Sequence, residues 1–82
     1  DRAGPEAAPL ESVTAEAKQA YRDQFGKWVV VLTDGATWRQ IDSESIAPPP
    51  RAGSKVEIRK AALGSFFMKV DGQRGVRAKR GD

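Results

Sequence analysis

The chain has 82 residues, and its 14 lysine and arginine residues outnumber its 11 aspartate and glutamate residues by three. It contains no cysteine and no histidine, which excludes a disulfide framework, a thiolate nucleophile, an imidazole base and the usual ligands of zinc, copper and haem. Residues 1–47 carry five basic and eight acidic side chains, a net charge of −3, whereas residues 48–82 carry nine and three, a net charge of +6. We therefore expect one small domain with a basic C-terminal half, no cofactor and no enzymatic activity.

The N-terminal quarter of the chain has two different compositions. Residues 1–10 are rich in alanine and proline without an aromatic or β-branched anchor, which predicts a disordered leader. Residues 11–25 are rich in alanine, glutamate, lysine and glutamine, which favours a short amphipathic helix. Its apolar face would carry Val13, Ala17, Ala20, Tyr21 and Phe25. Gly26 then suits the left-handed residue that ends a helix.

After Gly26 the pattern changes to a period of two, typical of a strand. Residues 27–33 place Trp28, Val30 and Leu32 on one face. Asp34-Gly35 predicts a two-residue type I′ turn, in which both residues have positive φ. The chain would return over 36–42, with the pairs Thr33–Ala36, Val31–Trp38 and Trp28–Ile41.

The C-terminal half predicts three further strands after a proline-rich connection. Residues 42–54 include Pro48-Pro49-Pro50-Arg51, which is either a stiff link or a ligand for SH3 or WW domains, and only Ile46 is able to pin this segment to a core. Strands follow at 55–60, 65–70 and 76–80, separated by glycine-bearing turns. Their inward side chains would be Val56, Ile58, Phe66, Met68, Val70, Val76 and Ala78. We expect a mainly β fold: a small five-stranded barrel over residues 26–82, preceded by the helix.

Several short motifs recur in the order seen in a known family. They are Phe25-Gly26, Trp38-Arg39-Gln40, Arg51 to Ile58 (RAGSKVEI) and Ala62 to Phe66 (ALGSF). In this order they resemble a C-terminal small β-barrel of uncharacterised exported proteins of proteobacteria, over about residues 25–80. The resemblance implies an SH3-like or OB-like barrel and a periplasmic or exported location, with no settled activity. The chain departs from the family pattern at Ser54, where an aspartate is usual.

The candidate partner-binding residues come from the outward positions of the strands. Lys55, Arg59, Lys69, Arg77 and Lys79 point away from the core in the strand pattern, and Phe67 has the same outward phase. Trp38 and Arg39 complete the set on the earlier hairpin. Together they form a basic and aromatic surface suited to phosphates, anionic lipids or acidic proteins. The alternative is that the charges only solubilise the strand faces, while Phe67 packs under the helix and both tryptophans are structural.

These observations favour a non-enzymatic binding module of the bacterial envelope. Its partner would be a protein or an anionic envelope component, and we expect a monomer. A barrel that binds nucleic acid through the same basic and aromatic face is the alternative. A cytoplasmic location stays open. The longest apolar run, Trp28 to Leu32, is far shorter than the roughly 20 residues of a membrane-spanning helix.

Overall fold

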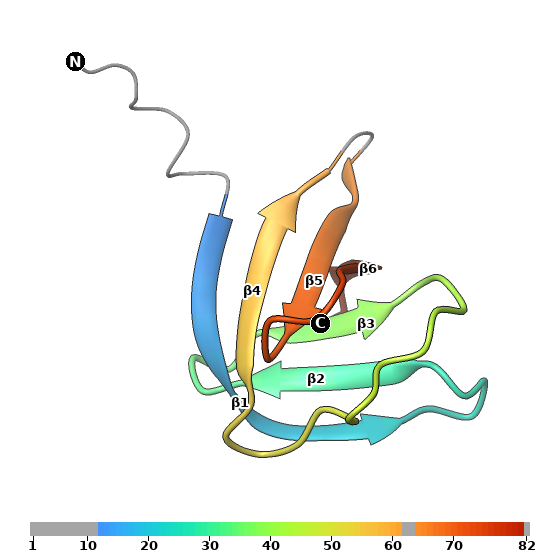
Figure 1. Cartoon of the computed structure of the whole chain (residues 1–82), viewed down its shortest axis with the longest axis horizontal. Coiled ribbons are helices and arrows are strands. Elements are labelled where there is room, and N and C mark those ends of the chain that lie inside the picture. Colours follow the sequence, from blue (N-terminus) through green and yellow to red (C-terminus); the bar gives the residue numbers. More distant parts are fainter. Residues whose placement is uncertain (1–11, 62–63, 82) are drawn as a thin grey trace.

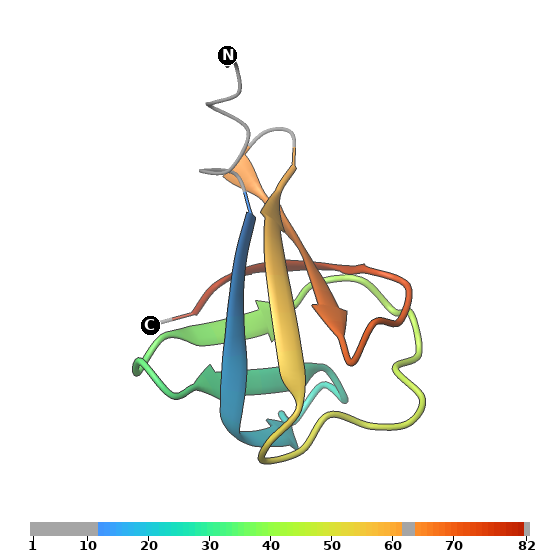
Figure 2. The same cartoon turned by 60° about the vertical axis from the view of Figure 1, so that its left-hand side comes forward.

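A computed structural model describes residues 12–61 and 64–81, and these residues form a closed antiparallel β-barrel. The six strands of this part of the chain are β1 (Ser12–Arg22), β2 (Trp28–Leu32), β3 (Thr37–Gln40), β4 (Lys55–Lys60), β5 (Phe66–Val70) and β6 (Val76–Arg80). Their order around the barrel is β1-β2-β3-β6-β5-β4. Two three-stranded meanders, β1–β3 and β4–β6, therefore close on each other through the β1–β4 and β3–β6 pairs (Figures 1 and 2).

The first strand replaces the predicted helix. β1 first pairs with β4, from Ser12 opposite Arg59 to Glu16 opposite Lys55. It then turns to run beside β2, where Arg22 lies opposite Trp28 (Figure 1). The prediction of a helix over 11–25 is therefore wrong, and so is the count of five strands, because the barrel recruits this segment as a sixth. The predicted leader, residues 1–10, lies outside the described residues.

A β-bulge explains why the segment reads like a helix in the sequence. The register with β2 shifts between Ala17 and Gln19, so the inward phase changes there. Ala17, 3% exposed, is the buried point of the bend, and Ala15 and Ala20 pack against the core on either side of it. At the bend the Ala17 N–H donates to the Ser54 carbonyl at 2.8 Å, and the Gly53 N–H donates to the Ala17 carbonyl at 2.9 Å. Small alanines thus allow a sharply bent strand to close the barrel.

The β2–β3 hairpin is present, but its turn is one residue longer than predicted. The Leu32 N–H donates to the Ala36 carbonyl at 2.8 Å, and the Gly35 N–H donates to the Leu32 carbonyl at 2.9 Å. Only Gly35, at φ 93°, has positive φ in this turn, which fits a three-residue loop that ends in a left-handed glycine. The strand pairing is displaced accordingly: Val30, rather than Val31, lies opposite Trp38. On the same β3 side Val29 lies opposite Arg39, so this register brings Gln40 rather than Ile41 opposite Trp28, and the predicted Trp28–Ile41 pair is also wrong.

The three C-terminal strands follow the predicted alternation. Val56, Ile58, Met68, Val70, Val76 and Ala78 are buried, and Phe66 packs against them. With Val30, Leu32 and Trp38 from the other meander they fill the barrel interior.

The connection between the two meanders is pinned as the sequence predicts. Ile46 is 7% exposed and belongs to the core cluster. The Gln73 side chain holds the same loop, since its Oε1 accepts the Ala47 N–H and its Nε2 donates to the Pro48 carbonyl, both at 3.0 Å. Ser54, where the chain departs from the family pattern, is buried, and its Oγ accepts the Arg51 N–H at 3.1 Å. A hydroxyl therefore caps this turn.

Candidate functional site on the outer face of β4, β5 and β6

One register row of the barrel carries an aromatic residue between two arginines. Arg59 on β4 lies opposite Phe67 on β5, and Phe67 lies opposite Arg77 on β6. All three residues have the outward phase, because their neighbours Ile58, Met68 and Ala78 are buried. The three strands lie side by side in Figures 1 and 2. At about 4.8 Å between strands, the row spans about 10 Å. We call Arg59, Phe67, Lys69 and Arg77 the basic–aromatic face.

The ring of Phe67 is partly covered by its neighbours. The Arg77 guanidinium carbon lies 5.3 Å from the ring centroid, within cation–π distance. A shallow hollow of about 220 Å³ lies beside the ring and is lined by Arg59, Phe67, Lys69 and Gly75. A Cβ at position 75 would lie 3.4 Å from Lys69 Cγ and 3.5 Å from Phe67 Cβ. These are ordinary van der Waals contacts, so a methyl group at this position would take up only part of the hollow. The described part of the chain has no helix, so the predicted packing of Phe67 under a helix is wrong.

A weak ion pair adjoins Arg59. Its Nη2 lies 3.8 Å from Glu57 Oε2, with 59% of the Arg59 side chain exposed. The same carboxylate oxygen accepts the Ser12 hydroxyl at 3.0 Å. An exposed pair at this distance contributes little to stability, so Arg59 is free to turn toward a ligand at small cost.

The remaining predicted site residues lie elsewhere on the barrel. Lys55 is at the far end of β4, between Glu16 on β1 and the loop residue Asp71, whose Oδ1 accepts the Lys55 N–H at 2.9 Å. Lys79 lies opposite Arg39 on the β3–β6 pair, and Arg39 Nη1 lies 3.8 Å from Asp23 Oδ2. Lys79 follows Arg77 on the same face of β6, so it extends the positive surface toward Arg39.

Trp38 does not share the outer face with Phe67. It is 8% exposed and belongs to the core. Its ring meets Phe66 edge to face, with centroids 4.9 Å apart and an interplanar angle of 74°. The prediction that groups Trp38 with the outward basic residues is therefore wrong about its position.

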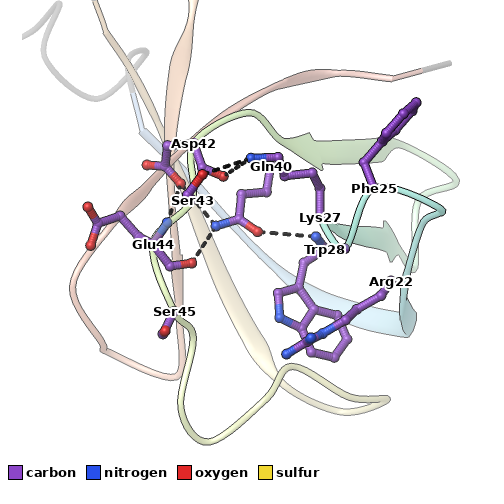
Figure 3. A pocket seen from close by; sticks show the side chains of 10 residues that line it. Arg22, Phe25, Lys27, Trp28, Gln40, Asp42, Ser43, Glu44 and Ser45 are labelled. Atoms are coloured by element: carbon purple, nitrogen blue, oxygen red, sulfur yellow. Dashed lines mark hydrogen bonds between the residues drawn. The ribbon is translucent and has the colours of Figure 1, made fainter.

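A polar network at one end of the barrel is absent from the predicted site. Gln40 is 4% exposed, and its Oε1 accepts the Trp28 N–H at 3.1 Å. Its Nε2 donates to Asp42 Oδ1 at 2.9 Å and to the Glu44 carbonyl at 2.6 Å. Figure 3 shows these contacts around a pocket of about 230 Å³. Gln40 follows Trp38 by two residues, so the strand pattern places both side chains toward the interior. This inward position was the signal in the sequence that could have identified Gln40.

Asp42 is held as a carboxylate by this network. Its Oδ1 also accepts the Glu44 N–H at 3.2 Å, and its Oδ2 accepts the Arg77 N–H at 2.9 Å. Burial is the largest single influence and would raise the pKa of Asp42, but the Arg77 N–H, the Gln40 amide, the Glu44 N–H and the charge of Lys27 together outweigh it. The pKa of Asp42 is therefore lowered from its ordinary value of 3.8.

The same pocket carries an aromatic wall outside the network. The Arg22 guanidinium carbon lies 5.0 Å from the Trp28 ring centroid (Figure 3). Lys27 Nζ donates to the Asp42 carbonyl at 2.8 Å and to Ser43 Oγ at 3.1 Å. Lys27 and Asp42 thus satisfy groups within the fold, and we assign the pocket a structural role.

Comparisons with known proteins supply no relative. No family model matches the chain, and no curated protein and no solved structure matches it. The resemblance to the exported proteobacterial barrel therefore stays a prediction. Within residues 12–61 and 64–81, no cluster of three or more acidic side chains is arranged to hold a metal ion. The same residues contain no helix with the length and apolarity to cross a membrane.

Proposed function

We propose that the chain is a non-enzymatic binding module of the bacterial envelope and that its basic–aromatic face recognises an anionic ligand. The observation that carries the proposal is the register row of Arg59, Phe67 and Arg77 beside an open hollow. Arginine forms paired hydrogen bonds with phosphate or carboxylate oxygens, and an aromatic face packs on the flat side of a sugar or base. The row therefore suits a ligand that carries a ring next to a negative charge.

The non-enzymatic part of the proposal rests on how Asp42 is used. A general acid or base needs an oxygen that can reach substrate. Both Asp42 oxygens accept hydrogen bonds from the fold, so neither is free to exchange a proton with a substrate. The envelope location rests on the sequence resemblance alone. Closure of the barrel supports the SH3-like or OB-like assignment and a monomer, since a closed sheet offers no open edge for pairing.

Single-stranded nucleic acid is the second candidate ligand. Phe67 flanked by two arginines offers a base a stacking surface and offers its phosphates two cations, as in small barrels that bind single strands. Salt separates the candidates, because affinity for single strands falls steeply with ionic strength, at about 0.7 of a logarithmic unit per phosphate contact.

The test is a titration of the ¹⁵N-labelled chain followed by NMR, with soluble peptidoglycan fragments, a single-stranded oligonucleotide and anionic vesicles as separate probes. We expect shifts centred on Arg59, Phe67, Lys69 and Arg77 with one probe. Phe67→Ala should weaken that binding about tenfold, since one stacked ring is worth roughly 1–3 kcal/mol. Phe25→Ala is the matched control, because Phe25 is 74% exposed on the β1–β2 turn and lies outside the face. Equal losses for the two variants, or no binding to any probe, would refute the proposal.

A further inference from the structure

The barrel end opposite the Gln40 network carries cations at inward positions. Lys60 ends β4 in phase with buried Val56 and Ile58, and Arg80 ends β6 in phase with buried Val76 and Ala78. The register places Lys60 opposite Phe66 and Arg80 opposite Trp38. Both side chains therefore start from the rim of the barrel rather than from its outer face. The outward phase of the strand pattern therefore does not include Lys60 and Arg80.

Between these cations the barrel opens into a mainly apolar cavity of about 260 Å³. Its apolar walls are formed by Val13, Leu32, Trp38, Ile58 and Phe66. The edge-to-face pair of Trp38 and Phe66 forms part of these walls, and the Arg80 guanidinium carbon lies 5.8 Å from the Trp38 centroid. Val13 is 56% exposed although its position at the cavity would suit burial. An apolar guest would cover it.

The rim charge favours an anionic head group. Lys60 is exposed and forms no ion pair with a carboxylate in residues 12–61 or 64–81. Asp34 also lines the cavity, but its Oδ1 already accepts the Ala36 N–H at 2.8 Å. Within the described residues Lys60 therefore adds a positive charge to the rim that no carboxylate pairs with. Apolar walls with a few polar groups at the entrance are the usual design of a small-molecule site.

We propose that this mouth binds a small amphipathic carboxylate, with its apolar body against Trp38 and Phe66 and its carboxylate beside Lys60. An apolar protein cavity of about 150 Å³ holds benzene, so 260 Å³ accommodates a single ring or a folded alkyl chain of medium length. This site is separate from the basic–aromatic face, because the two share no residue. Its ligand is therefore independent of the proposed function.

Octanoate, octanol and octylammonium are suitable probes, since they share one alkyl chain and differ in charge. The indole N–H signals in ¹⁵N NMR spectra of the full chain report on both ends of the barrel. Trp38 lines the mouth, and Trp28 lines the opposite pocket as an internal control. Octanoate should shift the Trp38 signal to saturation and leave Trp28 unchanged, whereas octanol should bind more weakly and octylammonium most weakly.

Two substitutions complete the experiment. Lys60→Gln should weaken octanoate about fivefold, the scale of an exposed ion pair, and leave octanol unchanged. Lys55→Gln, at the opposite end of β4, is the charge-matched control and should have no effect. Val13→Trp fills the mouth from an exposed position and should abolish octanoate binding. Equal affinity for all three probes, parallel shifts of both tryptophans, or no Trp38 shift would each overturn the proposal.

Discussion

Replacing Gln40 by leucine would remove the side chain that joins β2, β3 and the following loop. Leucine has a similar volume and remains compatible with the core, but the Trp28 N–H and the Glu44 carbonyl lose their partner. A net hydrogen bond is worth about 1 kcal/mol, and a buried group left without a partner costs about 1–3 kcal/mol. Both hydrogen bonds are partly buried, so each group that loses its partner keeps some access to water. We expect Gln40→Leu to lower the free energy of unfolding by about 2 kcal/mol.

Urea unfolding followed by tryptophan fluorescence measures this loss. An 82-residue chain has a total stability of roughly 4–12 kcal/mol, at 0.05–0.15 kcal/mol per residue. With a urea slope of about 1 kcal/mol per molar for a chain this small, the midpoint should fall by about 2 M. Gln19→Leu is the matched control, because Gln19 is exposed on β1, and its effect should stay within about 0.5 kcal/mol. Equal midpoints for the two variants would refute the structural role of the network.

Two further predictions concern the same barrel. The pKa of Asp42 is lowered in the folded chain, so its contribution to stability is complete above its unfolded pKa and is lost as the pH falls through the folded value. Between pH 6 and pH 2 the urea midpoint should therefore fall less for Asp42→Asn than for the parent chain. Parallel curves for the two chains would contradict this. Met68 is fully buried in the interior of the barrel. Thermal unfolding should therefore show that Met68→Ala lowers the free energy of unfolding by about 2–5 kcal/mol and Met68→Leu by less than about 1.5 kcal/mol. Similar losses for both variants would show that the core is not closely packed around this residue.

The second meander could be predicted because its sequence and its packing agree. In the middle of β4, β5 and β6, buried side chains alternate with less buried ones, whereas Lys60 and Arg80 at the strand ends are exposed although they share the inward phase. Each strand has one buried face and one outer face, which is the condition under which this pattern is reliable. The outward phase also placed Arg59, Phe67 and Arg77 correctly. These three side chains lie in one row because of the register between β4, β5 and β6. The lengths of the turns in the sequence were not enough to predict that register.

The first meander was harder to predict because local preference and tertiary context disagree. Alanine, lysine and glutamate favour a helix in isolation, yet residues 12–22 supply the strand that joins β2 to β4. The bulge at Ala17 moves the inward phase partway along β1, so no single period of two describes it. In the next hairpin, one additional loop residue moved every expected pair by one position. These features depend on barrel closure, which a local pattern does not encode.

The two ends of the barrel use inward polar side chains in different ways, and this difference separates structure from recognition. At one end the Gln40 amide has partners for its oxygen and for both of its N–H groups, so this end is sealed by groups of the fold itself. At the other end Lys60 and Arg80 stand over apolar walls that still enclose about 260 Å³. Apolar side chains that filled this space would gain packing energy. Within the described residues Lys60 has no carboxylate partner, and the ligand that we propose for this mouth, with an apolar body and a negative head, would supply one.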